Sequence, residues 1–321
     1  MKKMSWKEFG IIQNELDEFE DYLQNLLDSR QSLVKEAISN LAQAGGKRIR
    51  PALIITIAHL GNYKQQQVWN FAATIEILHM ATLIHDDIID ESHLRRGSKT
   101  VQSKYGKDRA VFAGDYLFSL AFNVLSDQAT SKQFKIVTDV INKICESEIQ
   151  QYQNRYNYSL SYRDYYYRIK HKTALLFESS CALGAENAGF NQVQLKKLAQ
   201  YGRYLGMAFQ LTDDLLDFKR EKVKLGKPNA NDFTNGIYTL PLLYVIKEKE
   251  CGQDLKELLS EAKSNKDEIR EFVIKNGGVD YTLSIAKKYI KKAQERLEHF
   301  PNNSYRMVLT ALTDKILARE F

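Results

Sequence analysis

The sequence predicts an all-α protein, and three observations favour that fold class. The chain has 321 residues but only four prolines, the residue that most often ends a helix. Runs of alternating apolar and polar residues, the pattern of a half-buried strand, are scarce. Apolar residues instead recur every three or four positions over most of the chain, as they do along one face of a helix. We expect a bundle of helices in one domain that spans residues 1–321.

The positions of the helices follow from apolar spacing and from the glycines and prolines that punctuate it. A first segment, over residues 6–44, is expected as one or two helices with a break near residue 29. Gly45 is a plausible helix end, and Pro51 suits the first turn of the next helix. The remaining helices are expected over residues 51–59, 68–90, 110–126, 132–155, 161–184, 192–218 and 239–249, with several more to residue 321. Polar loops are expected over residues 91–107 and 221–237.

Composition narrows the class of protein. Hydrophobic residues make up 44% and charged residues 27% of the chain, which is enough for a large core. The net charge of +6 comes from dispersed Lys and Arg, so a nucleic-acid partner is not expected. The three cysteines are widely spaced, which favours free thiols over a zinc site. The sequence shows neither a signal peptide nor a membrane-spanning run, and we expect a cytoplasmic protein whose contact with membranes is peripheral.

Two clusters of aspartates follow apolar helical runs. They consist of Asp86, Asp87 and Asp90 in the first case and of Asp213, Asp214 and Asp217 in the second. Residues three or four apart lie on one face of a helix, where bare carboxylates repel each other. A hard divalent cation such as Mg²⁺ removes the repulsion because it prefers oxygen ligands. Two clusters facing each other across a cavity between helices would hold several ions, and hence a diphosphate.

A single Asp-Asp-x-x-Asp string is most often a solvated helix end, but two copies after buried helices favour a metal site. The segments before the clusters, residues 75–83 and 205–211, are apolar. An apolar pocket closed by metal ions suits a hydrocarbon diphosphate. Departure of the diphosphate would leave an allylic carbocation, which the apolar walls would protect from water.

Basic residues lie near the first cluster and before it, and they indicate a second anionic substrate. They are Lys47, Arg48, Arg50, Arg95 and Arg96. Arginine suits bidentate contact with phosphate. Other residues have simpler interpretations when taken singly: His79 as a core histidine, Lys172–Thr173 as helix surface, and Tyr165–Tyr167 as packing.

Taken together, these motifs resemble those of the trans-isoprenyl diphosphate synthases. The strings that carry the resemblance are Gly45–Pro51, Asp86–Gly97, Lys172–Thr173, Gln210–Asp217, Leu225–Pro228 and Thr239–Pro241. They stand in the family's order and cover about residues 41–243. Within the family the chain is most similar to the catalytic subunits of bacterial heptaprenyl diphosphate synthases. The resemblance implies the isoprenoid synthase fold, an antiparallel helix bundle around a deep central cavity.

The resemblance also implies a reaction and the residues that perform it. The reaction is head-to-tail condensation of isopentenyl diphosphate with an allylic diphosphate, either farnesyl or geranyl. The six aspartates would ligate three Mg²⁺ ions, for which Mn²⁺ can substitute.

The allylic diphosphate would be contacted by Arg95, Lys172 and Lys227. Isopentenyl diphosphate would be held by Gly46, Lys47, Arg50, His79 and Arg96. The carbocation would be faced by the oxygen dipoles of Thr173 and Gln210. The chain departs from the family pattern at Ile237 and in its C-terminal tail, where Arg319 alone is basic.

The small residues Ala81 and Thr82 predict a product longer than farnesyl, used as a precursor of quinone side chains. They stand where farnesyl-length relatives carry an aromatic residue that closes the pocket. Going back along the helix, the first aromatic is Phe71, roughly 22 Å from Asp86. Alternatively another helix supplies the floor, with candidates Phe112, Tyr116, Phe118 and Phe122.

Several other readings compete with this one. The chain could form a homodimer, or a heterodimer in which a small regulatory subunit is required. A shorter-chain farnesyl or geranylgeranyl synthase would share the motifs. A class I terpene cyclase would share the first cluster, but Asp217 stands where its second motif needs Ser or Thr, and it has no need for a second diphosphate site. A non-catalytic subunit or a helical binding module would not need two intact acidic clusters.

Overall fold

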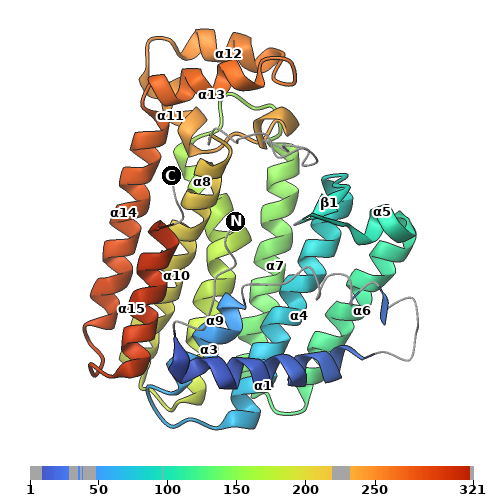
Figure 1. Ribbon diagram of the computed structural model, residues 1–321, viewed down its shortest axis with the longest axis vertical. Helices are drawn as coiled ribbons and strands as arrows, with labels where there is room; N and C mark the ends of the chain where they lie inside the picture. The colour runs from blue at the N-terminus through green and yellow to red at the C-terminus, as the bar shows by residue number, and fades with distance from the viewer. Residues whose placement is uncertain are drawn as a thin grey trace. The chain divides into compact units, whose positions relative to one another are not determined.

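The computed structural model describes residues 9–28, 35–36, 38, 48–95, 97–218 and 232–318. Within these ranges nearly every element is a helix, as predicted, and the strands form a single two-stranded hairpin (Figure 1). The chain divides into two compact units. The first comprises Met1–Lys135, Ser180–Leu195 and Asn302–Val308, and the second comprises Ile136–Ser179, Lys196–Pro301 and Leu309–Phe321.

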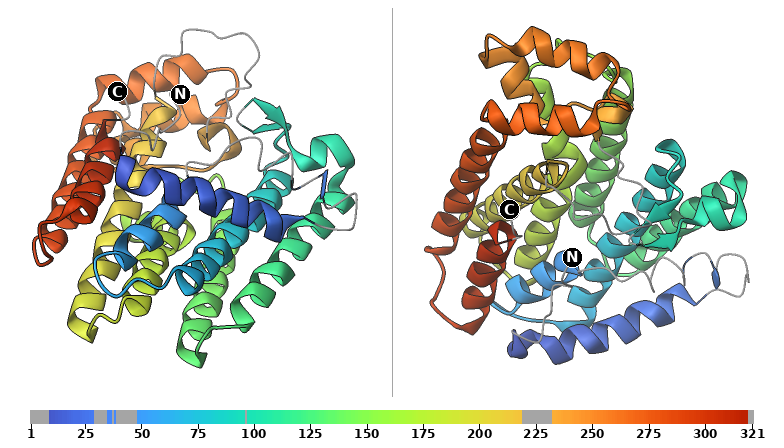
Figure 2. Two further views of the ribbon diagram at one scale, coloured as in Figure 1. Left: turned by 60° about the horizontal axis from the view of Figure 1, so that its bottom comes forward. Right: turned by 45° about the horizontal axis from the view of Figure 1, so that its top comes forward.

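The first unit is built around a buried helix. Its main elements are α1 (Gly10–Leu27), α3 (Ile49–Ala58), α4 (Gln65–Ile89), β1 (Leu94–Arg95), β2 (Ser98–Lys99), α5 (Val101–Tyr105) and α6 (Lys107–Ser126). Helix α4 is apolar on nearly every side and is buried along most of its length. Helix α6 runs beside it, while α1 lies crosswise to both (Figures 1 and 2). At Gly114 of α6, a Cβ atom would meet the ring of His85 in α4, so the glycine leaves room for that ring between the two helices.

The second unit contains the remaining helices. They are α8 (Tyr162–Ile169), the π-helix η2 (Lys170–Ala174), the 3-10 helix η3 (Asp232–Asn235), α11 (Leu240–Glu248), α12 (Gly252–Ser260), α13 (Lys266–Lys275) and α14 (Gly278–Leu297). Four helices contribute residues to both units, namely α7 (Ser131–Gln153), α9 (Leu175–Asn187), α10 (Gln192–Leu216) and α15 (Ser304–Leu317). The core of the second unit lies around α11, whose Leu240, Leu242 and Leu243 are fully buried.

Most of the predicted helices are present with boundaries shifted by a few residues, but two predictions need correction. Residues 91–107 are not simply a loop, because they contain the β1–β2 hairpin and α5. Gly97 and Gly106 both have positive φ angles, 87° and 93°, and they turn the chain. The segments around them are long enough to form the hairpin and one helical turn. The helix predicted over residues 161–184 is interrupted by the π-helix η2.

Other expectations concern the chain as a whole. All three cysteines are free. No helix in the described ranges is both long enough and apolar enough to cross a lipid bilayer. The predicted helix end at Gly45 lies outside the described residues, as does most of the loop predicted over residues 221–237. The single domain over residues 1–321 remains a prediction.

Candidate active site

The first aspartate cluster occupies the last turn of α4. Asp86 and Asp87 lie within the helix, and Asp90 is its C-terminal capping residue. The last turn of α4 carries no basic residue. The carboxylates therefore meet the negative end of the helix dipole, which costs about 0.3–1 kcal/mol for each exposed charge. An arrangement that opposes helix stability in this way is typical of a functional site.

Within this cluster, Asp87 differs from its neighbours. It is only 3% exposed, whereas Asp86 and Asp90 are partly exposed. Arg95 of β1 donates to the Asp87 carboxylate from Nε at 2.9 Å and from a terminal nitrogen at 2.8 Å. Burial raises the pKa of Asp87, and the guanidinium of Arg95 offsets part of that rise. Gln102 of α5 donates to the backbone carbonyl of Asp87, so the segment after α4 folds back onto the cluster.

The second cluster lies at the C-terminal end of α10, with Asp217 just beyond the helix, and it repeats this division. Asp213 and Asp217 are partly exposed, while Asp214 is 3% exposed. Tyr165 donates its hydroxyl to one oxygen of Asp214 at 2.5 Å, and Gln210 donates its amide to the other at 2.8 Å. Burial raises the pKa of Asp214 to about 7, although both hydrogen bonds act to lower it. The last turn of α10 also lacks a basic residue.

Asp217 lies near a fourth carboxylate, that of Asp232. Its side chain accepts a hydrogen bond from the backbone nitrogen of Asp232 in η3 at 2.9 Å. Burial raises the pKa of Asp217, and the charges of Asp232 and Asp214 raise it further. The second cluster is therefore an accumulation of negative charge that the protein only partly compensates.

This accumulation predicts a pH-dependent stability of the metal-free protein. Because the folded-state pKa values of Asp214 and Asp217 lie above the unfolded value of 3.8, the folded state holds protons that the unfolded state releases. The free energy of unfolding should therefore fall as pH rises from about 4 through about 7, by up to about 1.4 kcal/mol per pH unit for each carboxyl group.

Asp217→Asn should weaken this fall in unfolding free energy with pH, as measured by thermal unfolding in chelator. Asp254→Asn, a change at an exposed position of α12, should leave it intact. A slope equal to wild type in Asp217→Asn would contradict the prediction.

Lys172 and Thr173 lie on the π-helix η2, not on ordinary helix surface. A π-helical turn inserts an extra residue into a helix and is frequent at functional sites. Thr173 donates its hydroxyl to the side-chain oxygen of Gln210 at 2.6 Å, and Lys172 forms an ion pair with Glu148 of α7 at 2.7 Å. Gly206 makes the contact between Thr173 and Gln210 possible, because a Cβ atom at position 206 would lie 2.6 Å from the Cα atom of Ala174. Helix α10 can therefore approach η2 closely enough for Gln210 to reach Thr173.

The residues predicted to bind the second substrate are only partly described. Arg50 lies in the first turn of α3 and His79 in α4, seven residues before Asp86, and both are partly exposed. The residues Gly46, Lys47, Arg96 and Lys227, like Arg319, lie outside the described ranges.

Arg48 was predicted to help bind the second anionic substrate, but its contacts in the structure are with other helices. Its guanidinium forms ion pairs with Glu20 of α1 at 2.7 Å and Glu76 of α4 at 2.8 Å. Its backbone is left-handed, with φ of 46°. Arg48 therefore joins α1 to α4 and fixes the start of α3.

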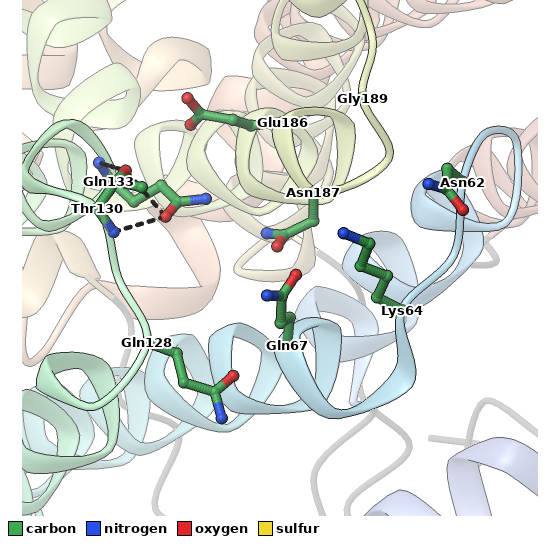
Figure 3. Close-up of a pocket in the computed structure, with 9 residues that line it drawn as sticks. All are labelled: Asn62, Lys64, Gln67, Gln128, Thr130, Gln133, Glu186, Asn187 and Gly189. Carbon is green, nitrogen blue, oxygen red and sulfur yellow. Dashed lines mark hydrogen bonds between the residues drawn. The ribbon is translucent and has the colours of Figure 1, made fainter.

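A cavity of about 280 Å³ lies in the first unit (Figure 3). Its lining is polar: Asn62, Lys64, Gln67, Gln128, Thr130, Gln133, Glu186, Asn187 and Gly189. Gln67 is near the N-terminal end of α4, roughly 28 Å along the helix from Asp86. This cavity has neither the apolar lining nor the position expected for a prenyl-chain pocket.

The sequence interpretation missed two partners of the predicted site residues. Tyr165 was assigned to packing, yet its hydroxyl binds Asp214, and Glu148 was not singled out, yet it holds Lys172. Tyr165 and Asp214 are 49 positions apart in sequence, so no local spacing connects them.

Comparison with known proteins agrees with the family resemblance. The family model for polyprenyl synthetase matches residues 31–275. Heptaprenyl diphosphate synthase component 2 of Bacillus subtilis (strain 168) is 35% identical over 98% of this chain and 90% of its own length. The crystal structure of heptaprenyl diphosphate synthase from Staphylococcus aureus matches with a TM-score of 0.90 at 31% identity, over 97% of this chain and 99% of that one. Geranylgeranyl pyrophosphate synthase from Lactobacillus brevis matches with a TM-score of 0.91 at 30% identity, over 99% of this chain and 100% of that one.

Proposed function

This chain belongs to the polyprenyl synthetase family of prenyltransferases, and we propose that it is a Mg²⁺-dependent trans-polyprenyl diphosphate synthase. The observation that carries the proposal is the pair of aspartate clusters at the C-terminal ends of α4 and α10. In each cluster two partly exposed carboxylates stand four positions apart, on either side of a buried one that the protein holds. Each cluster opposes its own helix dipole, so function accounts for it better than stability does.

The donor set fits Mg²⁺. The ions would be held by the six aspartates, namely Asp86, Asp87 and Asp90 of the first cluster and Asp213, Asp214 and Asp217 of the second. Asp87 and Asp214 also accept hydrogen bonds from protein donors. Within the described residues no three His, Cys, Asp or Glu side chains converge on a single point. Mg²⁺ usually takes one or two carboxylates and completes its shell with water and substrate phosphate. When bound, the ions would neutralise charge on the leaving diphosphate.

The remaining residues would place the two substrates. Arg95 and Lys172 would contact the allylic diphosphate; in the structure each is held by a carboxylate, Arg95 by Asp87 and Lys172 by Glu148. We assign Lys227 to the same diphosphate. Isopentenyl diphosphate would be bound by Gly46, Lys47, Arg50, His79 and Arg96.

The condensation breaks the allylic carbon–oxygen bond and forms a bond from C1 of the allylic group to C4 of isopentenyl diphosphate. The oxygen dipoles of Thr173 and Gln210 would face the cation that forms at C1. The proton that the coupled product then loses would go to the released diphosphate.

The experiment that tests this function is an elongation assay. Purified protein is incubated with Mg²⁺, farnesyl diphosphate and labelled isopentenyl diphosphate, and products are identified by mass spectrometry. A polyprenyl diphosphate longer than farnesyl is expected. A hydrocarbon made without isopentenyl diphosphate would overturn the proposal in favour of a terpene cyclase.

We further propose a product longer than farnesyl, because α4 carries the small side chains of Ala81 and Thr82 before the first cluster. Ala81 is fully buried and Thr82 partly buried, while Phe71 is buried about three turns further back. Among the aromatic residues considered for the floor, Phe112 is 64% exposed and cannot close a pocket within one chain. Phe118 packs beside His85 with the ring centres 5.6 Å apart, so it remains a candidate.

Ala81→Phe should shorten the product. If Ala81 lines the pocket for the growing chain, a phenyl ring fits into that space and blocks it, with little change in melting temperature. Mass spectrometry should show the main product reduced by at least one isoprene unit. Met80→Leu, a volume-conserving change at the buried neighbouring position, serves as control and should keep the wild-type length. If the Ala81→Phe protein made the wild-type product, or lost stability as an overpacked core does, by about 1–3 kcal/mol, Ala81 would not line the pocket.

We also propose that the chain works as a homodimer or with a small regulatory subunit. The words "component 2" in the name of the Bacillus subtilis relative support the second arrangement. Helix α6 presents Val111 and Phe112, which are 40% and 64% exposed, as apolar residues available for such a contact. Light scattering on the purified chain gives its mass in solution, and monomeric protein with full elongation activity would contradict both arrangements.

We place the enzyme in the cytoplasm, with peripheral membrane contact for release of its product.

A further inference from the structure

A continuous chain of hydrogen bonds links Tyr165 to the two residues assigned to the carbocation. Thr173 donates to Oε1 of Gln210 at 2.6 Å, and Nε2 of Gln210 donates to Asp214 at 2.8 Å. The hydroxyl of Tyr165 donates to the second oxygen of Asp214 at 2.5 Å. All four residues belong to the second unit, and all are at least partly buried.

The carboxylate of Asp214 sets the direction of every bond in this chain. The amide nitrogen of Gln210 can only donate, so it donates to one oxygen of Asp214, while the hydroxyl of Tyr165 donates to the other. The amide oxygen of Gln210 then points away from Asp214, and the hydroxyl of Thr173 donates to that oxygen. The lone pairs of Thr173 are thereby left available to face positive charge. Without this anchor, the amide of Gln210 could rotate and present its NH₂ group instead.

Tyr165 is rigidly held where it meets Asp214. Its side chain is fully buried, and the guanidinium of Arg168 lies 5.4 Å from its ring centre. Arg168 is itself fixed, because it donates to the backbone carbonyl of Tyr238 at 2.8 Å. The ring of Tyr166 packs edge-on, with centres 5.4 Å apart. A buried phenol in a single orientation can keep the Asp214 carboxylate in a single orientation too.

We propose that Tyr165 is a positioning residue, which acts through Asp214 to orient the amide of Gln210 and the hydroxyl of Thr173 toward the allylic cation. The inference rests on the proposed function, since that function gives Thr173 and Gln210 their task. Tyr165 touches neither substrate. Its contribution is to hold dipoles in place before charge develops, so that they need not reorganise during the reaction.

Tyr165→Phe tests the proposal, because it removes only the hydroxyl. We expect kcat to fall on the order of 10- to 100-fold, the loss typical of removing the partner that orients a functional group. The KM values for both diphosphates should stay within about twofold, because the oriented dipoles act on the transition state. Tyr166→Phe is the matched control: its hydroxyl lies outside the hydrogen-bond chain, and its kcat should equal that of wild type. An unchanged kcat in Tyr165→Phe would overturn the proposal.

A double variant separates positioning from a general structural effect. If Tyr165 acts through Gln210, adding Tyr165→Phe to Gln210→Met should lower kcat no further. Losses that multiply would overturn the proposal. The melting temperatures of the two single variants and the double variant are also measured without substrate. The double variant should show a smaller decrease in melting temperature than the sum of the decreases in the two single variants. Additive losses there would also overturn the proposal. The comparison of melting temperatures does not depend on catalysis, whereas failure of the proposed function would appear as a hydrocarbon made by wild type without isopentenyl diphosphate.

Discussion

The Asp86→Asn variant should lose on the order of 10³-fold in kcat/KM while keeping its fold. Asp86 is partly exposed in the last turn of α4, and we assign it to the ions that neutralise the allylic diphosphate. Asparagine keeps the shape of the side chain but removes the negative charge that attracts Mg²⁺. Removing one group that stabilises transition-state charge typically costs 10²–10³-fold, and loss of an ion should reach the upper part of that range. Steady-state elongation kinetics at several Mg²⁺ concentrations measure the effect.

The same substitution should leave the metal-free protein as stable as wild type, or more so, because it removes a charge that opposes the helix dipole. Glu91→Gln is the matched control. Glu91 lies one residue beyond the cluster, and its exposed side chain pairs with Lys107 at 2.8 Å. Its kcat/KM should remain within about twofold of wild type, because exposed ion pairs contribute little. Near-normal elongation by Asp86→Asn would show that the first cluster does not bind the ions.

Gly206→Ala should damage both stability and catalysis. The added Cβ atom would lie 2.6 Å from the Cα atom of Ala174 and 3.0 Å from the Cβ atom of Phe177, so α10 must move away from η2. Overpacking of this kind costs about 1–3 kcal/mol. The movement also lengthens the contact between Thr173 and Gln210, which is 2.6 Å in the native structure. Denaturant unfolding should report the loss of stability. The loss of catalysis should appear as a fall in kcat that is larger than any change in KM.

Gly10→Ala provides the comparison for that substitution. Gly10 begins α1, and a Cβ atom there would meet nothing within 4 Å. Alanine should therefore be neutral or stabilising by about 0.5–1 kcal/mol, since glycine is the poorer residue in a helix. If Gly206→Ala behaved like Gly10→Ala, close approach of α10 to η2 would not be what positions Gln210.

The fold class and most helices could be predicted because both depend on apolar spacing along the sequence. Helix α4 illustrates this, since its apolar run and the aspartates that follow it are visible in order. The hairpin and α5 between Glu91 and Lys107 could not be predicted in the same way. Their apolar content is low, and their structure depends on two glycine turns and on hydrogen bonds back to α4.

The site residues were predictable by type but not by partner. The aspartates stand out because carboxylates at the end of a buried helix oppose its stability. Their division into buried and partly exposed members depends on tertiary contacts such as Arg95 with Asp87 and Tyr165 with Asp214. The π-helix that presents Lys172 and Thr173 has no periodic signal of its own. Arg48 is a residue whose role was predicted wrongly. Its place in a basic run suggested substrate binding, but in the structure its ion pairs join α1 to α4.

We propose that the two aspartate clusters act on one allylic diphosphate, and a double-mutant cycle of ligand binding tests this proposal most directly. Calorimetry would measure Mg²⁺-dependent binding of an unreactive farnesyl thiolodiphosphate to wild type, Asp86→Asn, Asp213→Asn and the double variant. If both clusters hold ions on the same diphosphate, each single variant should lose most of the Mg²⁺-dependent affinity, and the double variant should lose little more. Losses that add independently, or a single variant that binds like wild type, would contradict the claim.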